Sequence, residues 1–566
     1  MRQAAGWQGW ALAMGALLAQ AHAMAQTRPD AGTLQEQQRL LPALPQPGGP
    51  RPVLPPVPEA RESSPAVRIT PTAFRIQGNT VFDGATLAGL LQPLVGQPTD
   101  LAGLRAAARR IKGYYQDRGY LLTDVYVPEQ ALPAGGGPVT LAVVEARVGR
   151  VTVRGGEASP SLPAMYALVR KELQPGDPIT EDKLDRPVLL LRDLFGHEAV
   201  ATVEPGGRPG EADIGFEVRP VGRRLDFSVG ADNHGTRAAG EYRAFATLDA
   251  ANLGADGDAL AARVQLADIT DTRLFRVSYT LPAIGLTRAS ITATRTEYAL
   301  GKQFAALGAT GHANVLGVSA LYPLIRSRSR NLYLSLGLDH KDLEDETLAS
   351  PATGQRIDSV RVALLGNHAD PVAADSFTSF ALSATAGRLR LDAASRAVDQ
   401  APGGLDTAGS FSKLNLELQR TQYLGGNFSL HGALQAQVAS RNLASAEKIS
   451  LGGPTGVRGY PSGDGIGDSG ALLTLEGRYQ LPVSLANEPV SVFLFYDAGT
   501  VRFNQDGSAA GPSRRTIDGA GLGLLAGRAG NYLLNASMAW RLGSPLPPAG
   551  EPDRSPRFWL TAQKWF

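Results

Sequence analysis

The spacing of hydrophobic residues changes near position 225. Before it, apolar residues recur at helical spacing in several short segments. After it, helical spacing disappears and apolar residues alternate with polar ones in short runs separated by turn residues. In 332–339, for example, leucine occupies every second position, and Tyr, Ser, Gly and Asp occupy the others. This change predicts an α+β part followed by a long all-β part.

Two successive segments of the α+β part, 67–146 and 147–220, show the same predicted element order, β-α-α-β-β. Matching order at a fixed period indicates two copies of one small module. In the first segment we expect a strand around Phe74, helices over 85–94 and 100–118, and strands over 121–127 and 139–144. In the second we expect a strand from 150, helices over 162–173 and 180–195, and strands over 199–204 and 212–218.

The remaining residues, 221–566, alternate between a leucine-rich face and a face rich in Arg, Glu, Asp and Gln. Apolar-out and polar-in alternation is typical of a membrane barrel with a wet lumen. At about ten residues per spanning strand plus connections, the segment has room for roughly 16 strands. The chain ends in Phe566, and Trp559 and Trp565 suit the aromatic belt at a membrane interface. The predicted fold class is an all-β 16-stranded antiparallel transmembrane β-barrel preceded by two small α+β domains.

The first residues predict export and a tethered element. Residues 1–25 have an apolar core and the small-residue site Ala23-Met24-Ala25, which is typical of a cleaved signal peptide. Residues 26–41 contain a short predicted helix that Asp30 can cap. Residues 42–66 contain nine prolines and predict an extended, semi-rigid linker. A helix on such a tether can dock and leave.

Composition excludes several classes of function. The 55 Lys+Arg balance the 53 Asp+Glu, so the basic excess of a nucleic-acid-binding protein is missing. There is no cysteine, the histidines are scattered singly, and no phosphate-binding loop occurs, which argues against a metal, a nucleotide or another cofactor. The Gly-Asp-Ser-Gly stretch at 467–470 imitates a protease motif, but no matching histidine motif accompanies it. We therefore expect no catalytic residues.

One glycine-rich loop carries the main candidate chemistry. Eight glycines fall within the twenty residues from Leu451, around Arg458 and Tyr460. Alternation in the flanking strands places Asp497 and Glu476 on the polar, lumen-facing side. A guanidinium offers a planar fork of donors, so Arg458 is predicted to bind Asp497 in a bidentate manner, with Glu476 nearby. The glycines would let the loop backbone fit inside the barrel.

The whole mature chain resembles the two-partner secretion transporters of the Omp85 superfamily, the exporters of haemolysin and filamentous haemagglutinin. The matching stretches are Asp117–Gln130, Val457–Tyr460 and Phe495–Gly499. The resemblance implies that 67–146 and 147–220 are periplasmic POTRA domains, and that the N-terminal helix plugs the pore. It also implies that the tip of the sixth extracellular loop folds back into the barrel and meets the Phe-x-Asp-x-Gly strand. The implied motif residues are Arg118, Gly119, Tyr120, Pro128 and Glu129 in the first POTRA domain, and Val457, Arg458, Gly459 and Tyr460 in the loop.

The resemblance further implies a translocase in the outer membrane of a Gram-negative cell, with its POTRA domains in the periplasm. It would bind a large secreted TpsA-like partner in unfolded form, contact outer-membrane lipid, and secrete the partner without ATP. Two alternatives remain open at this point. One is an assembly insertase of the same superfamily, against which two POTRA modules and a tethered helix argue. The other is a passive porin-like channel, which would carry solute without any dependent secreted protein.

Overall fold

A computed structural model describes residues 29–37, 44, 48, 68–131, 136–155, 161–268, 272–370, 376–506, 513–543 and 554–566. The predicted signal peptide lies outside the described residues, as does nearly all of the predicted linker. The chain forms two compact units, one of 48–222 with 326–328, the other of 1–47, 223–325 and 329–566. Among the described residues, no helix has the length and apolar character needed to cross a membrane.

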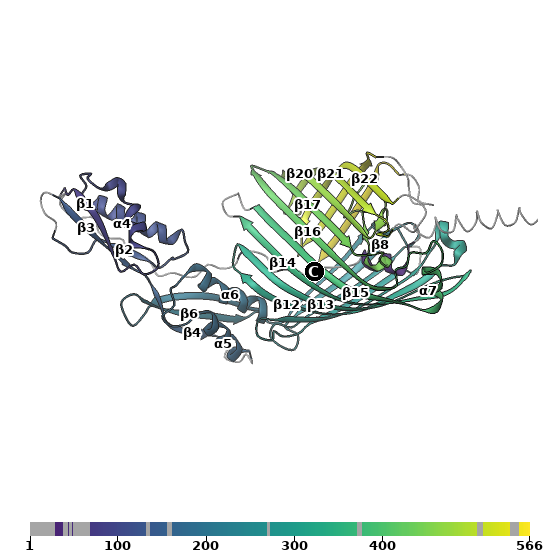
Figure 1. Ribbon diagram of the computed structural model, residues 1–566, viewed down its shortest axis with the longest axis horizontal. Helices are drawn as coiled ribbons and strands as arrows, with labels where there is room; N and C mark the ends of the chain where they lie inside the picture. Colours follow the sequence, from purple (N-terminus) through teal and green to yellow (C-terminus); the bar gives the residue numbers. More distant parts are fainter. Residues whose placement is uncertain are drawn as a thin grey trace, which may run out of the picture. The chain divides into compact units, whose positions relative to one another are not determined.

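The first module is a three-stranded sheet covered by helices, with strand order β1-β3-β2 (Figure 1). Its main helix, α4, begins where the Asp100 carboxylate accepts a hydrogen bond from Gly103 N at 2.8 Å. The helix buries the apolar face that its spacing predicts, including Leu104, Ile111 and Tyr115. The bounds are β1 (Pro71–Gln77), α3 (Gly84–Gly89), η1 (Gln92–Leu94), α4 (Leu101–Gln116), β2 (Asp124–Tyr126) and β3 (Gly137–Val144).

The second module repeats this arrangement with strand order β4-β6-β5. Helix α6 begins at the Thr180 cap and ends at Gly196, whose φ of 62° lies in the left-handed region that glycine adopts without strain. Within this unit the modules are joined directly, because Glu181 N donates to Gly119 O at 2.8 Å. The bounds are β4 (Arg147–Arg154), α5 (Leu162–Glu172), α6 (Glu181–Phe195), β5 (His197–Pro205) and β6 (Glu211–Pro220).

One predicted strand is much shorter in the structure. We expected it over 121–127, but β2 covers only Asp124–Tyr126. Gly119 has a φ of +87°, and Tyr120 N donates to Tyr115 O at 3.0 Å, so the chain is still turning after α4. The two leucines at 121 and 122 belong to this turn rather than to the sheet.

The larger unit contains a closed sheet of 16 strands in which β24 pairs with β7. The strand pairs are antiparallel, as in β7–β8 and β20–β21. The predicted 16-stranded antiparallel barrel is confirmed. The bounds are β7 (Arg224–Asp232), β8 (Arg243–Ala251), β9 (Ala259–Ala267), β10 (Arg273–Thr280), β11 (Arg288–Ala299), β12 (Thr310–Arg326), β13 (Arg330–Thr347), β14 (Ser350–Asp370), β15 (Ser376–Leu391), β16 (Gly409–Gly425), β17 (Phe428–Ala439), β20 (Ser469–Leu485), β21 (Glu488–Arg502), β22 (Arg514–Arg528), β23 (Tyr532–Arg541) and β24 (Arg557–Trp565).

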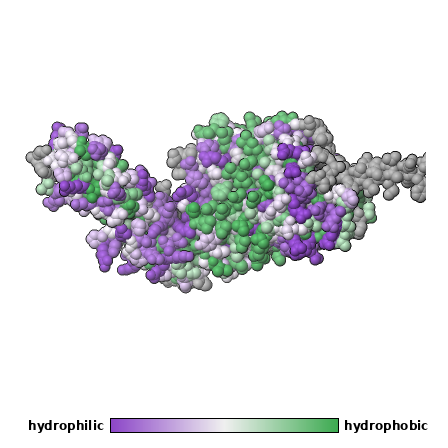
Figure 2. Space-filling model, viewed as in Figure 1, coloured by the Kyte–Doolittle hydropathy of each residue, from purple (hydrophilic) through white to green (hydrophobic). Residues whose placement is uncertain are grey.

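The two faces of the barrel wall differ in character. On β13, Leu334 and Leu336 are exposed on the outside, whereas Tyr333 and Ser335 are buried inside. Figure 2 shows the resulting hydrophobic band across the barrel wall, bordered by hydrophilic surface. Apolar residues outside and polar residues inside are what a lipid-embedded barrel requires.

Chain segments occupy the barrel lumen. The long connection between β17 and β20, residues 440–468, is called loop 6 below; it contains η3 (Ser445–Glu447), β18 (Ile449–Ser450) and β19 (Ile466–Gly467). Helix α2 (Ala31–Glu36) packs against it, and Ala31 and Leu34 share a buried cluster with Ala444 and Ala446. Two further helical segments lie in connections between barrel strands: η2 (Lys302–Leu307) and α7 (Ala393–Asp399).

The buried Glu145 of the first module makes its stability pH-dependent. Its carboxylate accepts hydrogen bonds from the Thr80 hydroxyl, from Tyr115 Oη at 2.7 Å, and from the backbone N of Thr80 and Val81 at 2.9 Å each. Burial opposes ionisation, but these bonds outweigh it and hold the pKa of Glu145 below its ordinary value of 4.5. The ionised carboxylate therefore stabilises the module above that value, and the stabilisation is lost as pH falls through the lower pKa of the folded state.

We expect Glu145→Gln to flatten the acid limb of the stability profile. The measurement is urea unfolding of a fragment containing 68–222, followed by circular dichroism between pH 3 and 6. Tyr115→Phe should lower stability at neutral pH by about 1.5–3 kcal/mol, since one hydrogen bond to a charged group is lost. An acid limb of the same slope in the wild type and in Glu145→Gln would contradict this assignment.

Candidate functional site

Loop 6 returns into the barrel as a tightly folded hairpin. Its two short strands β18 and β19 pair at the base. At the tip, Val457 N donates to Leu451 O at 2.7 Å and Tyr460 N donates to Val457 O at 3.1 Å. A side chain at Gly456 would place its Cβ 2.0 Å from Leu451 O, so only glycine permits this fold.

Arg458, Asp497 and Glu476 form a compact ionic group, called the loop 6 clamp below. Arg458 Nε and Nη2 each lie 2.8 Å from an Asp497 carboxylate oxygen, and Nη1 lies 2.8 Å from Glu476 Oε1. The backbone N of Arg458 also donates to Asp497 Oδ2 at 3.1 Å. Arg458 is 7% exposed, Glu476 8% and Asp497 0%. The contact with Asp497 is bidentate, the strongest geometry available to an arginine and a carboxylate.

The charges around the clamp balance. Arg478 binds the other oxygen of Glu476, with Nη2 at 2.6 Å. The Arg458 guanidinium also lies over the Phe495 ring, 3.4 Å from its centroid. Two arginines thus face two carboxylates. Removing one partner of such a buried pair typically costs about 3–5 kcal/mol, because the other charge is left without compensation.

Two further contacts tie the loop tip to the seam where β24 meets β7. Trp559 Nε1 donates to Arg458 O at 2.8 Å, and Ser462 Oγ donates to His234 O at 2.8 Å. The expectation that Trp559 lies in the membrane interface is wrong. Its neighbours Phe558 and Leu560 are exposed on the outer face, so alternation turns Trp559 inward, where it is 5% exposed. The sequence analysis missed the contact of Trp559 with the loop tip. The alternation along β24 would have predicted that its side chain points inward.

The side chains of Val457 and Tyr460 make packing contacts rather than hydrogen bonds. Both are fully buried in an apolar cluster next to the clamp. The Tyr460 hydroxyl is buried without a hydrogen-bond partner among the described residues. Gly459 lies against the wall, since an added Cβ would come within 3.1 Å of Trp540 O. The cluster consists of Leu451, Val457, Tyr460, Leu472, Val501 and Ile517.

A second ionic group holds the beginning of loop 6. Glu447, which is 3% exposed, lies 2.7 Å from Lys341 Nζ and 2.8 Å from Lys413 Nζ. Lys413 Nζ also donates to Glu447 O at 2.8 Å. Sequence reasoning did not identify this group. Alternation places both lysines on the lumen face, but nothing in the local sequence indicates which loop residue they meet.

Helix α2 packs against η3 of loop 6, the short helical segment that contains Glu447. Ala31 N, at the start of the helix, donates to Asp345 Oδ1 at 2.9 Å, and Thr296 Oγ1 donates to Gln35 Oε1 at 3.0 Å. The helix touches loop 6 closely at Gly32, where an added Cβ would lie 2.3 Å from Ser445 Oγ. The described part of the helix is therefore seated between the barrel wall and loop 6.

The motif residues of the first module serve packing and the junction between modules. The Arg118 guanidinium lies 3.5 Å from the Tyr114 ring centroid, and Tyr120 meets Phe82 edge-on at 5.5 Å. Gly119 O accepts the bond from Glu181 N described above. Two other motif residues follow β2 further along the chain: Pro128, whose carbonyl accepts from Gln130 Nε2 at 3.2 Å, and Glu129, which is exposed.

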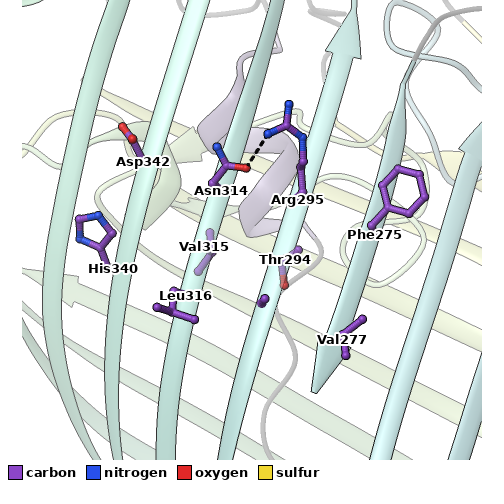
Figure 3. Close-up of a pocket in the computed structure, with 10 residues that line it drawn as sticks. Phe275, Val277, Thr294, Arg295, Asn314, Val315, Leu316, His340 and Asp342 are labelled. Carbon is purple, nitrogen blue, oxygen red and sulfur yellow. Dashed lines mark hydrogen bonds between the residues drawn. The ribbon is translucent and has the colours of Figure 1, made fainter. Parts of the chain in front are cut away.

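A groove of about 450 Å³ lies on the outer wall of β10–β13 (Figure 3). Its lower part is apolar, with Val277 and Leu316, and its upper part contains Arg295, Asn314 and His340. Arg295 is already bound, with Nη1 at 3.1 Å from Asn314 Oδ1 and Nη2 at 2.6 Å from Glu297 Oε1. The groove lies on the outer face of the barrel, apart from the lumen. Among the described residues, no three His, Asp or Glu side chains approach one another as a metal site requires.

Comparison with known proteins identifies the family. The model of the haemolysin secretion/activation protein ShlB/FhaC/HecB matches 210–526, more than half of the chain. That of the ShlB-type POTRA domain matches 69–146. The chain is 28% identical over 485 residues to the heme/hemopexin transporter protein HuxB of Haemophilus influenzae, covering 85% of this chain and 84% of that protein. It is 24% identical to the outer membrane transporter CdiB of Escherichia coli, covering 75% and 71% of the two chains.

Solved structures agree on the fold. CdiB from Escherichia coli superposes with a TM-score of 0.65 at 19% identity, covering 90% of this chain and 93% of that one. CdiB from Acinetobacter baumannii gives 0.58 at 16% identity, covering 94% and 96%. The resemblance inferred from the motifs is confirmed: the chain belongs to the haemolysin secretion/activation ShlB/FhaC/HecB family of two-partner secretion transporters, outer-membrane β-barrel proteins with periplasmic POTRA domains.

Proposed function

We propose that the protein captures an unfolded exported partner in the periplasm and secretes it through its barrel without ATP. The observation that carries this proposal is the loop 6 clamp, which fixes a long loop inside the lumen of a 16-stranded barrel. Membership of a family of secretion transporters supports it. The partner would be a large secreted protein of the TpsA-like type.

Capture would take place at a sheet edge of the POTRA modules. In the second module the order β4-β6-β5 leaves one edge of β5 without a strand partner among the described residues. An extended polypeptide can add to such an edge through backbone hydrogen bonds, which tolerate many sequences. Pockets that receive every second side chain of the added strand would give modest selectivity for the partner's sequence. This mode suits a partner that is still unfolded.

Transport through the lumen requires helix α2 to leave. Its described part is six residues long. It is held by the Asp345 carboxylate, which accepts from Ala31 N, and by the Thr296 hydroxyl, which donates to Gln35. A helix this short is unstable alone and depends on its contacts. A proline-rich tether would let it withdraw while remaining attached.

The clamp would act as a brace for the conducting state. Its buried ionic contacts anchor the loop tip to β20 and β21, while Glu447 anchors the loop base to β13 and β16. A loop held at both ends keeps the wall in one shape while the helix leaves. Folding of the partner outside the cell would supply direction.

Arg458→Ala should reduce secretion of the partner at least tenfold while the barrel still inserts. The substitution leaves two buried carboxylates without their main partner, so the loop loses its anchor. The measurement is the partner in the culture medium, normalised to barrel abundance. Arg478→Ala is the matched control, since it also removes an arginine from Glu476 but leaves the loop tip attached to Asp497. Equal secretion by wild type and Arg458→Ala would refute the brace.

Gly32→Val should increase ion conductance through the barrel in planar bilayers. The new side chain would meet Ser445 Oγ at 2.3 Å and the backbone N of Ala446 at 2.7 Å, so helix α2 cannot seat. Gly477→Val is the control, because a Cβ there meets nothing within 4 Å. If both variants conduct like the wild type, α2 does not close the pore.

A further inference from the structure

One face of helix α4 in the first module carries three cations. Arg105, Arg109 and Lys112 occupy positions i, i+4 and i+7, which lie on the same face of a helix. No Asp or Glu occurs anywhere within α4. We call these three residues the α4 basic stripe. Like charges four residues apart weaken a helix, so the stability of the module does not account for this pattern.

Two of the three cations have no acidic partner. Lys112 Nζ lies 3.0 Å from Asp124 Oδ1 of β2, whereas Arg105 and Arg109 make no ion pair among the described residues. The acid that precedes the helix, Asp100, caps its N-terminus. The two arginines therefore keep their charge available for an anionic group from outside the chain.

The stripe lies beside an open edge of the sheet. Helix α4 packs against β2 (Figure 1), and the ion pair between Lys112 and Asp124 places the stripe next to that strand. In the order β1-β3-β2, one edge of β2 has no strand partner among the described residues. Where β2 ends, the edge of β3 is closed, because Gln130 Nε2 donates to Thr140 O at 2.9 Å and Gln130 Oε1 accepts from Thr140 N at 2.8 Å. The open edge is thus the part next to the stripe.

The spacing of the two arginines matches that of side chains along a strand. Arg105 and Arg109 are four residues apart, which is about 6 Å along a helix axis. Side chains two residues apart in an extended strand lie on the same side, at about 6.4–6.8 Å. A peptide paired with β2 would therefore present every second side chain to the helix at nearly the spacing of the two arginines. Carboxylates at these positions would each meet one guanidinium.

Backbone pairing alone would bind weakly at this edge. Strand β2 is only three residues long, so an added strand gains few backbone hydrogen bonds from it. Side-chain contacts must then supply much of the affinity and determine which sequences bind. Glu129, which follows β2, is exposed and makes no ion pair among the described residues. The three cations of the stripe outnumber Asp124 and Glu129, so this surface favours acidic sequences.

We propose that the α4 basic stripe and the open edge of β2 bind acidic, extended segments of the exported polypeptide. The backbone of the segment pairs with β2, and carboxylates at alternate positions bind Arg105 and Arg109. This assignment rests on the proposed transport function. It adds that the first module selects segments of the partner by their charge.

The first test measures binding of labelled peptides to the full chain in detergent by fluorescence anisotropy. The probe is a short peptide of alternating Glu and Thr, and the reference peptide alternates Gln and Thr. The wild type should bind the Glu/Thr peptide about tenfold more tightly than the Gln/Thr peptide, since two exposed ion pairs contribute about threefold each. Added salt should reduce this preference, because exposed charges are screened.

Single substitutions separate this face from net charge. Arg109→Gln should weaken binding of the Glu/Thr peptide about threefold, and Arg105→Gln/Arg109→Gln should remove the preference over the Gln/Thr peptide. Arg110→Gln is the matched control, because it removes the same charge at the next position, which points about 100° away around the helix. This control should bind both peptides as the wild type does. None of the three arginines is buried, so the variants should fold.

A third measurement tests pairing with β2. A Glu/Thr peptide that is methylated at every backbone nitrogen keeps its carboxylates but has no amide donors. This peptide should bind at least tenfold more weakly than the unmethylated peptide, a loss of one unit of log affinity. Equal binding of the two peptides would overturn the strand addition.

Equal affinity of the wild type and the double variant for the Glu/Thr peptide overturns the stripe as a binding surface. An equal loss in Arg109→Gln and Arg110→Gln means that only net charge acts, which overturns the assignment to this face. Failure of the transport function would show separately. In that case no secreted protein would depend on this chain, whereas the preference for the Glu/Thr peptide would still depend on Arg105 and Arg109.

Discussion

The structure depends on the burial of one positive charge. Arg458 is almost completely removed from water, and its guanidinium is compensated by Asp497 and Glu476 from adjacent strands of the wall. A buried charge without this compensation would be too costly to keep. The path of loop 6 is therefore fixed by where the two carboxylates lie. Tyr460 and Val457 then fill the apolar space next to the clamp, and Trp559 of the closing strand donates to the Arg458 carbonyl.

The second ionic group, Glu447 with Lys341 and Lys413, extends this principle to the base of the loop. The hydrophobic band on the outside of the barrel offers lipid only apolar contact, and the ionic anchors of loop 6 lie inside. Helix α2 uses the inner surface in a weaker way, through Asp345 and close packing at Gly32. Among the described residues of the lumen, loop 6 is therefore firmly held and helix α2 is lightly held. This difference suits a pore in which loop 6 stays and the helix leaves.

Sequence alone predicted the fold well, because alternation records which side of the wall each residue faces. The 16-stranded barrel and the two α+β modules follow from periodicity and length, whereas the family resemblance was needed to interpret the modules as POTRA domains. The same alternation placed Asp497 and Glu476 on the lumen side, and in the structure Arg458 binds both. Alternation does not show which loop residue contacts a lumen side chain, so Glu447 was not predicted as the partner of Lys341 and Lys413. Trp559 was wrongly assigned to the membrane interface because it is aromatic and near the barrel terminus. The alternation with the exposed Phe558 and Leu560 was not considered. The strand β2 was predicted too long because the sequence does not show how far the turn after Gly119 continues.

The most direct test of the central claim is a double-mutant cycle between Arg458→Gln and Asp497→Asn, measured as the free energy of urea unfolding of the barrel in detergent. If the clamp holds loop 6, each single variant leaves a buried charge uncompensated, so the double variant loses less stability than the sum of the two single losses. The coupling energy should then be about 1–3 kcal/mol, as for directly interacting buried partners. Additive losses, with a coupling energy near zero, would contradict the claim that this ion pair fixes the loop inside the lumen.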